Sequence, residues 1–186
     1  MSHELRDAQA DMRHGYCGGG AGMLASAILW LAAGVVALRL APQTAVWTLL
    51  VGGMAIHPAG MVIERLLGRP GTHSKGNPLA GLAGATTVWL IASLPLAYAA
   101  SRLHIEWFFP AMLLVIGSRY LTFETLYGLR AYRYCGLALL AAGLVLGRAM
   151  PAPALAALVG GAIEAGFAIA ILLQDRRRSQ PATAAA

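Results

Sequence analysis

The sequence predicts an all-α integral membrane protein, a bundle of six transmembrane helices. The chain of 186 residues is 58% hydrophobic and only 12% charged, and its mean hydropathy is +0.64. A soluble domain carries roughly twice that charged fraction. Several uncharged runs reach the length of about 20 residues that a helix needs to cross a bilayer. The helices are expected at residues 16–38, 45–63, 79–100, 107–130, 132–147 and 154–173.

The basic residues lie mostly between these helices, and their distribution predicts an orientation. Of the 14 Lys and Arg residues, ten lie on the side that carries both termini, three lie on the other side, and Arg119 lies inside a helix. This asymmetry predicts cytoplasmic N and C termini in a multi-pass protein of the cytoplasmic (inner) membrane. The net charge of +6 does not indicate nucleic-acid binding, because the basic residues form no single face.

The chain divides into a membrane domain and two polar ends. Residues 1–15 interleave acids and bases and predict a polar cytoplasmic tail, with a short helix on the membrane surface as the alternative. Residues 16–174 form the six-helix domain, and residues 175–186 are expected to be a disordered basic tail. Cys17 and Cys135 are expected to be reduced and structural. The chain has no CxxC or Cys/His cluster, so neither a metal nor a cofactor is expected.

Small residues and a proline mark two of the predicted helices. Gly18, Gly22 and Ser26 recur every fourth residue, which favours close helix packing. A nucleotide loop is the weaker interpretation, because Met23 stands where GxGxxG requires its third glycine. Pro58 lies inside the helix of residues 45–63 and is expected to kink it.

Short segments of the sequence recur and predict an internal repeat. The LAAG of residues 31–34 returns at 140–143, each time followed five residues later by arginine and three further on by proline. LVGG then follows at 50–53 and 158–161, and the middle third is a looser copy. The pattern predicts three tandem two-helix hairpins about a pseudo-threefold axis. The alternative is chance, since Leu, Ala, Gly and Val dominate any membrane protein.

The helix of residues 107–130, WFFPAMLLVIGSRYLTFETLYGLR, carries ionisable groups before its span is complete. Such groups are costly in hydrocarbon and usually face the interior of a bundle. In the repeat, His57, Arg119 and Glu164 fall at similar depth, so we expect them to converge. Two interpretations stay open: a structural ion pair between Arg119 and Glu164, or a site that binds a solute or relays protons. The candidate cluster is His57, Arg119, Tyr120, Glu124 and Glu164.

The polar loop of residues 64–78 joins the second and third helices. It lacks the spacing of a phosphate-binding P-loop. Basic residues next to a membrane helix attract anionic lipid, so contact with anionic headgroups is favoured over a dedicated phosphate site. The residues expected to make that contact are Arg65, Arg69, His73 and Lys75.

Three classes of function remain open. The leading one is a small-solute or proton-linked transporter or channel-like protein that uses the polar cluster. The second is a membrane-embedded enzyme acting on a lipid or prenyl phosphate at the cytoplasmic face, with Glu124 or His73 moving protons. The third is a non-catalytic assembly or regulatory partner, and a homo-oligomer stays open. No catalytic residue is assigned, because DxxxD, HExxH and Ser/His patterns are absent.

At residues 107–130 and at GRPGTHSKGNPL, residues 68–79, the chain resembles a family of small bacterial multi-pass membrane proteins classed as a domain of unknown function. The resemblance covers nearly the whole chain. It implies a bacterial cytoplasmic-membrane protein of about six spans. It implies no activity and assigns no functional residue.

Overall fold

The computed structural model describes residues 3–179, and every regular element among them is a helix. Each of the six predicted long helices has a counterpart, and its ends lie within a few residues of those expected, except that the last helix continues to Ser179 instead of ending at residue 173. The elements are α1 (His3–Tyr16), η1 (Cys17–Gly19), α2 (Gly20–Arg39), α3 (Pro42–Leu66), α4 (Ala80–Leu103), η2 (Ile105–Trp107), α5 (Phe108–Tyr127), α6 (Arg130–Ala149) and α7 (Pro153–Ser179).

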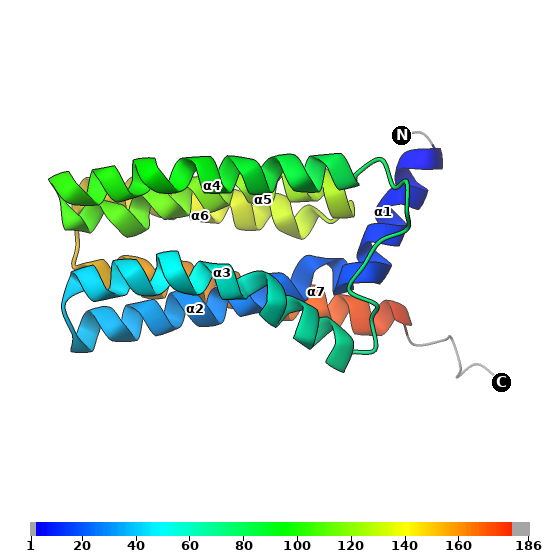
Figure 1. Ribbon diagram of the computed structural model, residues 1–186, viewed down its shortest axis with the longest axis horizontal. Helices are drawn as coiled ribbons and strands as arrows, with labels where there is room; N and C mark the ends of the chain where they lie inside the picture. The colour runs from blue at the N-terminus through cyan, green and yellow to red at the C-terminus, as the bar shows by residue number, and fades with distance from the viewer. Residues whose placement is uncertain (1–2, 180–186) are drawn as a thin grey trace.

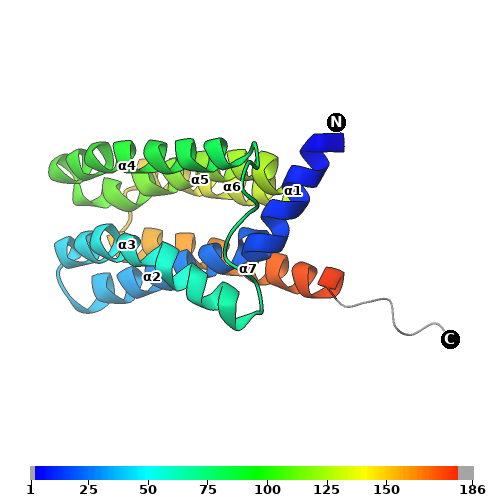
Figure 2. The same cartoon turned by 45° about the vertical axis from the view of Figure 1, so that its right-hand side comes forward.

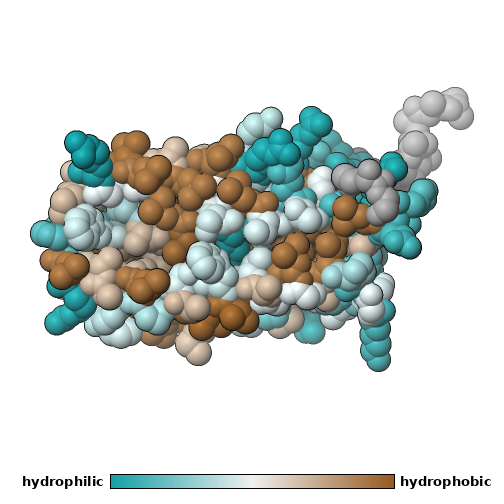
Figure 3. All heavy atoms as spheres, turned by 90° about the horizontal axis from the view of Figure 1, so that it is seen from above, coloured by the Kyte–Doolittle hydropathy of each residue, from teal (hydrophilic) through white to brown (hydrophobic). Residues whose placement is uncertain are grey.

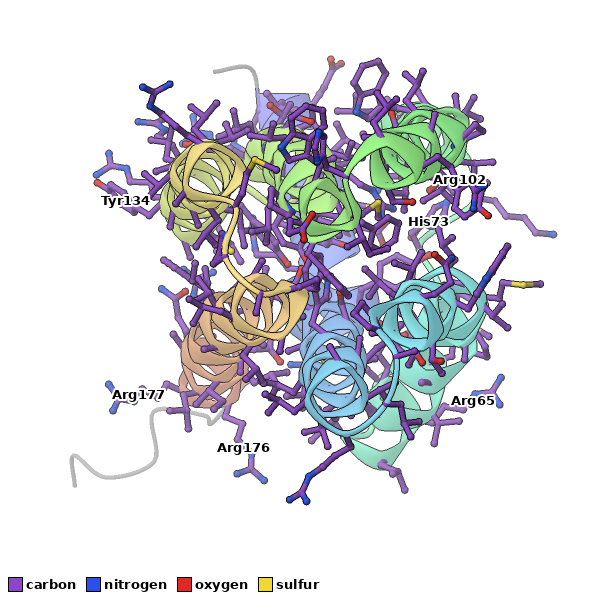
Figure 4. The ribbon with its side chains drawn as sticks, turned by 90° about the vertical axis from the view of Figure 1, so that its left-hand side faces the viewer. Arg65, His73, Arg102, Tyr134, Arg176 and Arg177 are labelled. Atoms are coloured by element: carbon purple, nitrogen blue, oxygen red, sulfur yellow. The ribbon has the colours of Figure 1, made fainter. Side chains whose placement is uncertain are left out.

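Helices α2 to α7 run along one common axis and form two layers of three (Figure 1). Seen along that axis, α2 lies between α3 and α7 in one layer, and α5 lies between α4 and α6 in the other (Figure 4). The most extensive pairings are α2 with α7, α5 with α6, and α2 with α3. By contrast, α3 and α4 make little contact, although Trp47 and Tyr98 approach with ring centroids 5.4 Å apart.

Small residues decide which helices pair closely. A Cβ atom added to Gly117 of α5 would lie 2.9 Å from the carbonyl oxygen of Gly136 on α6. The reverse substitution at Gly136 would place its Cβ 2.7 Å from the Gly117 oxygen. Such close backbone approach is what small residues permit between membrane helices.

The small-residue stripe at the start of α2 is likewise used inside the molecule. A Cβ on Gly60 of α3 would lie 3.2 Å from the Cα of Gly22. Gly18 and Ser26 are buried. The predicted packing role of this stripe is therefore confirmed, and its partners are helices of the same chain.

Several helices are apolar and long enough to identify a membrane protein. By length and composition, four segments among residues 3–179 could cross a membrane: His3–Arg39, Pro42–Leu66, Ala80–Leu103 and Pro153–Arg178. The outer surface agrees, since Met54 is 81% exposed and Leu96 is 74% exposed. On the face seen in Figure 3, hydrophobic side chains spread along the molecule and hydrophilic ones gather toward its ends.

The three hairpins are not packed alike. The repeated arginines lie at equivalent places, because Arg39 ends α2 and Arg148 is the last residue but one of α6. However, α2 packs extensively on α3, whereas α6 and α7 share a smaller contact and α7 packs mainly on α2. Three equivalent hairpins around an axis are therefore not confirmed, because the most extensive contacts pair α5 with α6 and α2 with α7, which belong to different hairpins.

Helix α1 crosses the end of the bundle obliquely (Figure 2). The solvated tail that the sequence favoured is therefore wrong for residues 3–16, because Ala8, Gln9 and Met12 are buried. The Gln9 side-chain amide donates to the carbonyl of Thr125 at 2.8 Å, and Arg13 donates to the carbonyl of Tyr127 at 2.6 Å. These carbonyls belong to the last turn of α5, where no intrahelical donor exists.

Two further expectations concern helix ends and bends. The basic residues 176–178 continue α7, so the expected disordered tail does not begin at residue 175. The rest of that tail, residues 180–186, lies outside the described residues.

Pro58 lies inside α3, and the second half of α3 bends away from the opposite layer (Figure 1). A proline that lacks the N–H of a regular turn accounts for such a bend.

Candidate functional site between the helix layers

Glu164 of α7 lies between the two layers, and only 1% of its surface is exposed. Its Oε1 accepts a hydrogen bond of 2.9 Å from the Tyr120 hydroxyl of α5. Ser26 of α2 lies beside the same carboxyl group. The other oxygen, Oε2, is buried and has no hydrogen-bond partner among residues 3–179. Burying a carboxylate is costly unless a cation or several donors compensate, so this carboxyl group is incompletely satisfied.

Arg119 faces α4 instead of Glu164. Its Nη2 donates to Thr87 Oγ1 at 3.2 Å, and its guanidinium carbon lies 5.0 Å from the centroid of the Phe123 ring. Its Nε atom is buried without a partner within the described part of the chain. None of the ion pairs found across residues 3–179 joins Arg119 to Glu164. The structural ion pair considered from the sequence therefore does not form in this structure.

Tyr120 belongs to a cluster of four aromatic rings. Neighbouring ring centroids are 5.4 to 5.8 Å apart, which is the usual spacing for interacting aromatic pairs. Three of the rings come from α5 and the fourth from α6. The rings are those of Tyr120, Phe123, Tyr127 and Tyr132.

Tyr132 makes the second buried hydrogen bond between the layers. Its hydroxyl donates to the Gly18 carbonyl in η1 at 2.7 Å. Gly19 must be glycine here: its φ is +80°, and an added Cβ would lie 2.3 Å from the Tyr132 hydroxyl and 2.8 Å from Tyr127 Cε2. The glycine run that superficially resembles a nucleotide loop thus leaves room for the rings of Tyr127 and Tyr132 to pack against the start of α2.

Two of the predicted cluster residues lie elsewhere. His57 is exposed on α3, so the predicted convergence of an imidazole with Arg119 and Glu164 is wrong. The face of α3 toward α2 includes Leu49 and Gly52, and His57 follows the next inward position, Ile56, by about 100° around the helix. Glu124 pairs with Arg133 of α6, its Oε2 accepting from Nε at 2.7 Å.

The predicted cationic loop is divided between internal contacts and the surface. Arg69 donates to Asp175 of α7 at 2.8 Å and lies 3.0 Å from His14 Nδ1. His73 Nδ1 lies 2.8 Å from the Tyr16 hydroxyl. Arg65 and Lys75 are exposed. The four side chains therefore do not converge on one phosphate-sized point, which leaves the enzymatic interpretation without an assembled site.

Three buried groups at or near the site are not predicted by the sequence pattern. The sequence places Glu64 in a loop, yet it lies buried in the last turn of α3 with Oε2 lacking a hydrogen-bond partner among the described residues. Ser26 and Tyr132 carry no sequence signal that makes them neighbours of the site. A signal exists only for a hydrogen bond of Tyr132, because a tyrosine in an apolar helix usually needs a partner for its hydroxyl. Nothing in the sequence points to which carbonyl that partner is.

The arrangement can hold a proton and join the two helix layers, and it does not resemble a metal centre. Within residues 3–179, no three His, Cys, Asp or Glu side chains are grouped as a metal ion would require. Cys17 and Cys135 are free thiols and buried, in line with a structural role. Both buried hydrogen bonds, Tyr120 to Glu164 and Tyr132 to Gly18, cross from one layer to the other.

Comparison with known proteins identifies the family without an activity. No curated protein and no solved structure matches the chain. The model of a family of unknown function, DUF7010, matches residues 5–174, which include all of α2 to α6 and most of α7. This chain therefore belongs to the DUF7010 family, a family of unknown function.

Proposed function

We propose that this protein crosses the cytoplasmic membrane six times and moves a small solute in a proton-linked manner, with Glu164 as the residue that takes up and releases the proton. The observation that carries the proposal is the Glu164 carboxyl group, 1% exposed, with one oxygen bound by Tyr120 and the other lacking a partner among the described residues. An ionisable residue inside a membrane domain is a candidate functional site by default.

The length and direction of the helices support six spans. Helices α5 and α6 have 20 residues each, the same as α2, and they run along the same axis (Figure 1). Twenty residues of helix extend about 30 Å, the thickness of the hydrocarbon core. The charged side chains of α5 are accommodated inside the bundle or at its end, where Arg119 meets Thr87 and Glu124 meets Arg133. The basic end that carries α1 faces the cytoplasm.

The two-layer architecture supports transport. Alternating access to a fixed site is largely a rocking or gating movement of one helix bundle against another. Here the layers α2–α3–α7 and α4–α5–α6 make little contact between α3 and α4, and α3 and α4 contain Pro58 and Pro95. A change in the protonation of Glu164 alters its bond with Tyr120, which crosses between the layers. Proton binding and layer movement are thereby coupled at one contact.

The test is proton flux in proteoliposomes that contain an internal pH-sensitive dye. A potassium diffusion potential drives protons inward, with and without a mixture of amino acids and short carboxylic acids outside. We expect wild-type protein to conduct protons faster than empty vesicles under at least one of these conditions, and Glu164→Gln to reduce the flux to the empty-vesicle rate.

Glu124→Gln is the matched control, because Glu124 is an acid of α5 that pairs with Arg133 instead of facing α7. This variant should keep the wild-type flux. The proposal fails if Glu164→Gln and wild-type vesicles conduct equally under every condition, or if both glutamine variants lose flux to the same extent.

A further inference from the structure

A groove of about 980 Å³ opens on the molecule between the end of α3 and the last turns of α7. This volume is at the upper end of the range of small-molecule sites. Leu66 and Leu67 line one side, and Ile169 and Leu173 of α7 line the other. All four side chains are at least 40% exposed, so the groove has an apolar floor that residues 3–179 leave uncovered.

The end of the groove nearest the helix termini has a different chemistry. Arg69, Asp175 and Arg176 line it there. Arg69 and Asp175 pair with each other at 2.8 Å, with side chains only 14% and 17% exposed. Arg176 is exposed, and its side chain extends away from the helix bundle (Figure 4). The apolar groove therefore ends at the Arg69–Asp175 ion pair, which has no net charge, and at the exposed guanidinium group of Arg176.

The groove also lies at the boundary that a membrane would have. Leu66 is the last residue of one candidate span, and Ile169 to Arg176 lie within the last ten residues of another, which ends at Arg178. At such a boundary, a lipid presents acyl chains toward the bilayer centre and a phosphate toward water. The leucines and isoleucine of the groove match the chains, and Arg176 matches the phosphate.

We propose that this groove is a binding site for an anionic phospholipid, with an acyl chain along Leu66, Ile169 and Leu173 and the phosphate at Arg176. The charge of the site decides the class of lipid. A zwitterionic headgroup would bring a cation to Arg176 and so gain less. The proposal stands independently of transport, because none of these residues contacts Glu164 or Tyr120 among the described interactions.

The experiment measures lipid binding by native mass spectrometry on the full chain in an uncharged detergent. Three probes are compared at equal concentration: dioleoyl phosphatidylglycerol, dioleoyl phosphatidylcholine, and glycerol phosphate, which has the headgroup chemistry without chains. We expect phosphatidylglycerol to bind at least fivefold more tightly than phosphatidylcholine, and glycerol phosphate not to bind. Arg176→Gln should weaken phosphatidylglycerol binding about fivefold, the effect of one basic residue near a lipid surface.

Two matched pairs of variants locate the site. Ile169→Trp fills the groove and should abolish the tight lipid adduct, while Leu155→Trp, a similarly exposed site near the other end of α7, should not. Arg177→Gln changes the neighbouring charge, which does not line the groove, and should leave binding within twofold. If Ile169→Trp does not give a monodisperse protein, Leu173→Trp replaces it.

Equal binding of phosphatidylglycerol and phosphatidylcholine would overturn the proposal, as would equal losses for Arg176→Gln and Arg177→Gln. Tight binding of glycerol phosphate alone would also overturn it, because the site would then recognise a free phosphate compound rather than a lipid.

Discussion

At the end of the bundle, Asp11 of α1 accepts hydrogen bonds from the Ser74 hydroxyl at 2.7 Å and from the Asn77 amide at 2.7 Å. Between the layers, Glu164 accepts one hydrogen bond from Tyr120 and has a second oxygen without a partner among residues 3–179. The exposed carboxyl group is thus better satisfied than the buried one. If both groups served only to stabilise the fold, Glu164 would need more protein hydrogen bonds than Asp11, because water can satisfy Asp11 but cannot easily reach Glu164.

The difference separates a fully hydrogen-bonded polar network from an incompletely hydrogen-bonded one in this molecule. The clasp formed by Asp11, Ser74 and Asn77 holds the loop of residues 67–79 against α1, and each member has several partners. Between the layers, the buried carboxyl group of Glu164 has few hydrogen-bond partners. Fully satisfied networks rigidify a protein, whereas an incompletely satisfied buried group needs another explanation, such as a role in function.

The largest effect is expected for Gly19→Ala. An alanine would have to adopt φ +80° and place its Cβ 2.3 Å from the Tyr132 hydroxyl, so the free energy of unfolding should fall by about 3 kcal/mol or more. The buried thiols of Cys17 and Cys135 supply the assay, because a thiol-reactive fluorophore reports their exposure on heating. Gly53→Ala, where an added Cβ meets nothing within 4 Å, is the control. Equal melting temperatures for the two variants would contradict the packing described.

Tyr132→Phe should come next. It removes the donor to the Gly18 carbonyl and leaves that oxygen unsatisfied, at a cost of about 1–3 kcal/mol. The same thermal assay measures it. Tyr134→Phe removes a hydroxyl from a side chain that is 59% exposed, and its melting temperature should match wild type. A wild-type melting temperature for Tyr132→Phe would mean that this bond does not hold the layers together.

The clasp should show a small dependence on pH. Hydrogen bonds from Ser74 and Asn77 hold the pKa of the Asp11 carboxyl group below its ordinary value. A lowered pKa in the folded protein means that the clasp stabilises above the ordinary carboxyl pKa of about 3.9 and loses this contribution as the pH falls below it. Between about pH 5 and pH 3, wild type should therefore lose more thermal stability than Asp11→Asn.

Asp7→Asn is the control for this titration, because Asp7 is exposed and its partner, His3, lies on the same helix at 3.2 Å. That variant should follow the wild-type curve. Parallel curves for wild type and Asp11→Asn would show that the clasp does not contribute through the charge of Asp11.

The smallest effect on stability is expected at Glu164. Glutamine keeps an acceptor for the Tyr120 hydroxyl and removes a potential buried charge. The free energy of unfolding of Glu164→Gln should therefore lie within about 1 kcal/mol of the wild-type value or above it. This result would sharpen the comparison, because the same substitution is expected to abolish proton flux. A large loss of stability would instead assign Glu164 a structural role.

The helices were predictable from the sequence because their signals are local. The uncharged runs and the charges between them place α2 to α7 within a few residues of their observed bounds, apart from the C-terminal end of α7. The neighbours of Glu164 were less accessible. Tyr120 was in the predicted cluster, but Ser26, Tyr132 and the exposed position of His57 depend on the rotation of helices distant in sequence. The short repeats favoured a threefold arrangement that the packing does not show.

The sequence by itself determined that this is an all-helical membrane protein with an acid and an arginine inside its helices, because hydrophobicity and charge act residue by residue. Only the tertiary structure decided that Arg119 faces Thr87 while Glu164 meets Tyr120. It also decided that α1 is folded against the end of α5 and that α3 and α7 leave a groove between them. The physical reason is that apolar helices can pack in many ways in a membrane. Close contacts between small residues such as Gly117 and Gly136 select one of them.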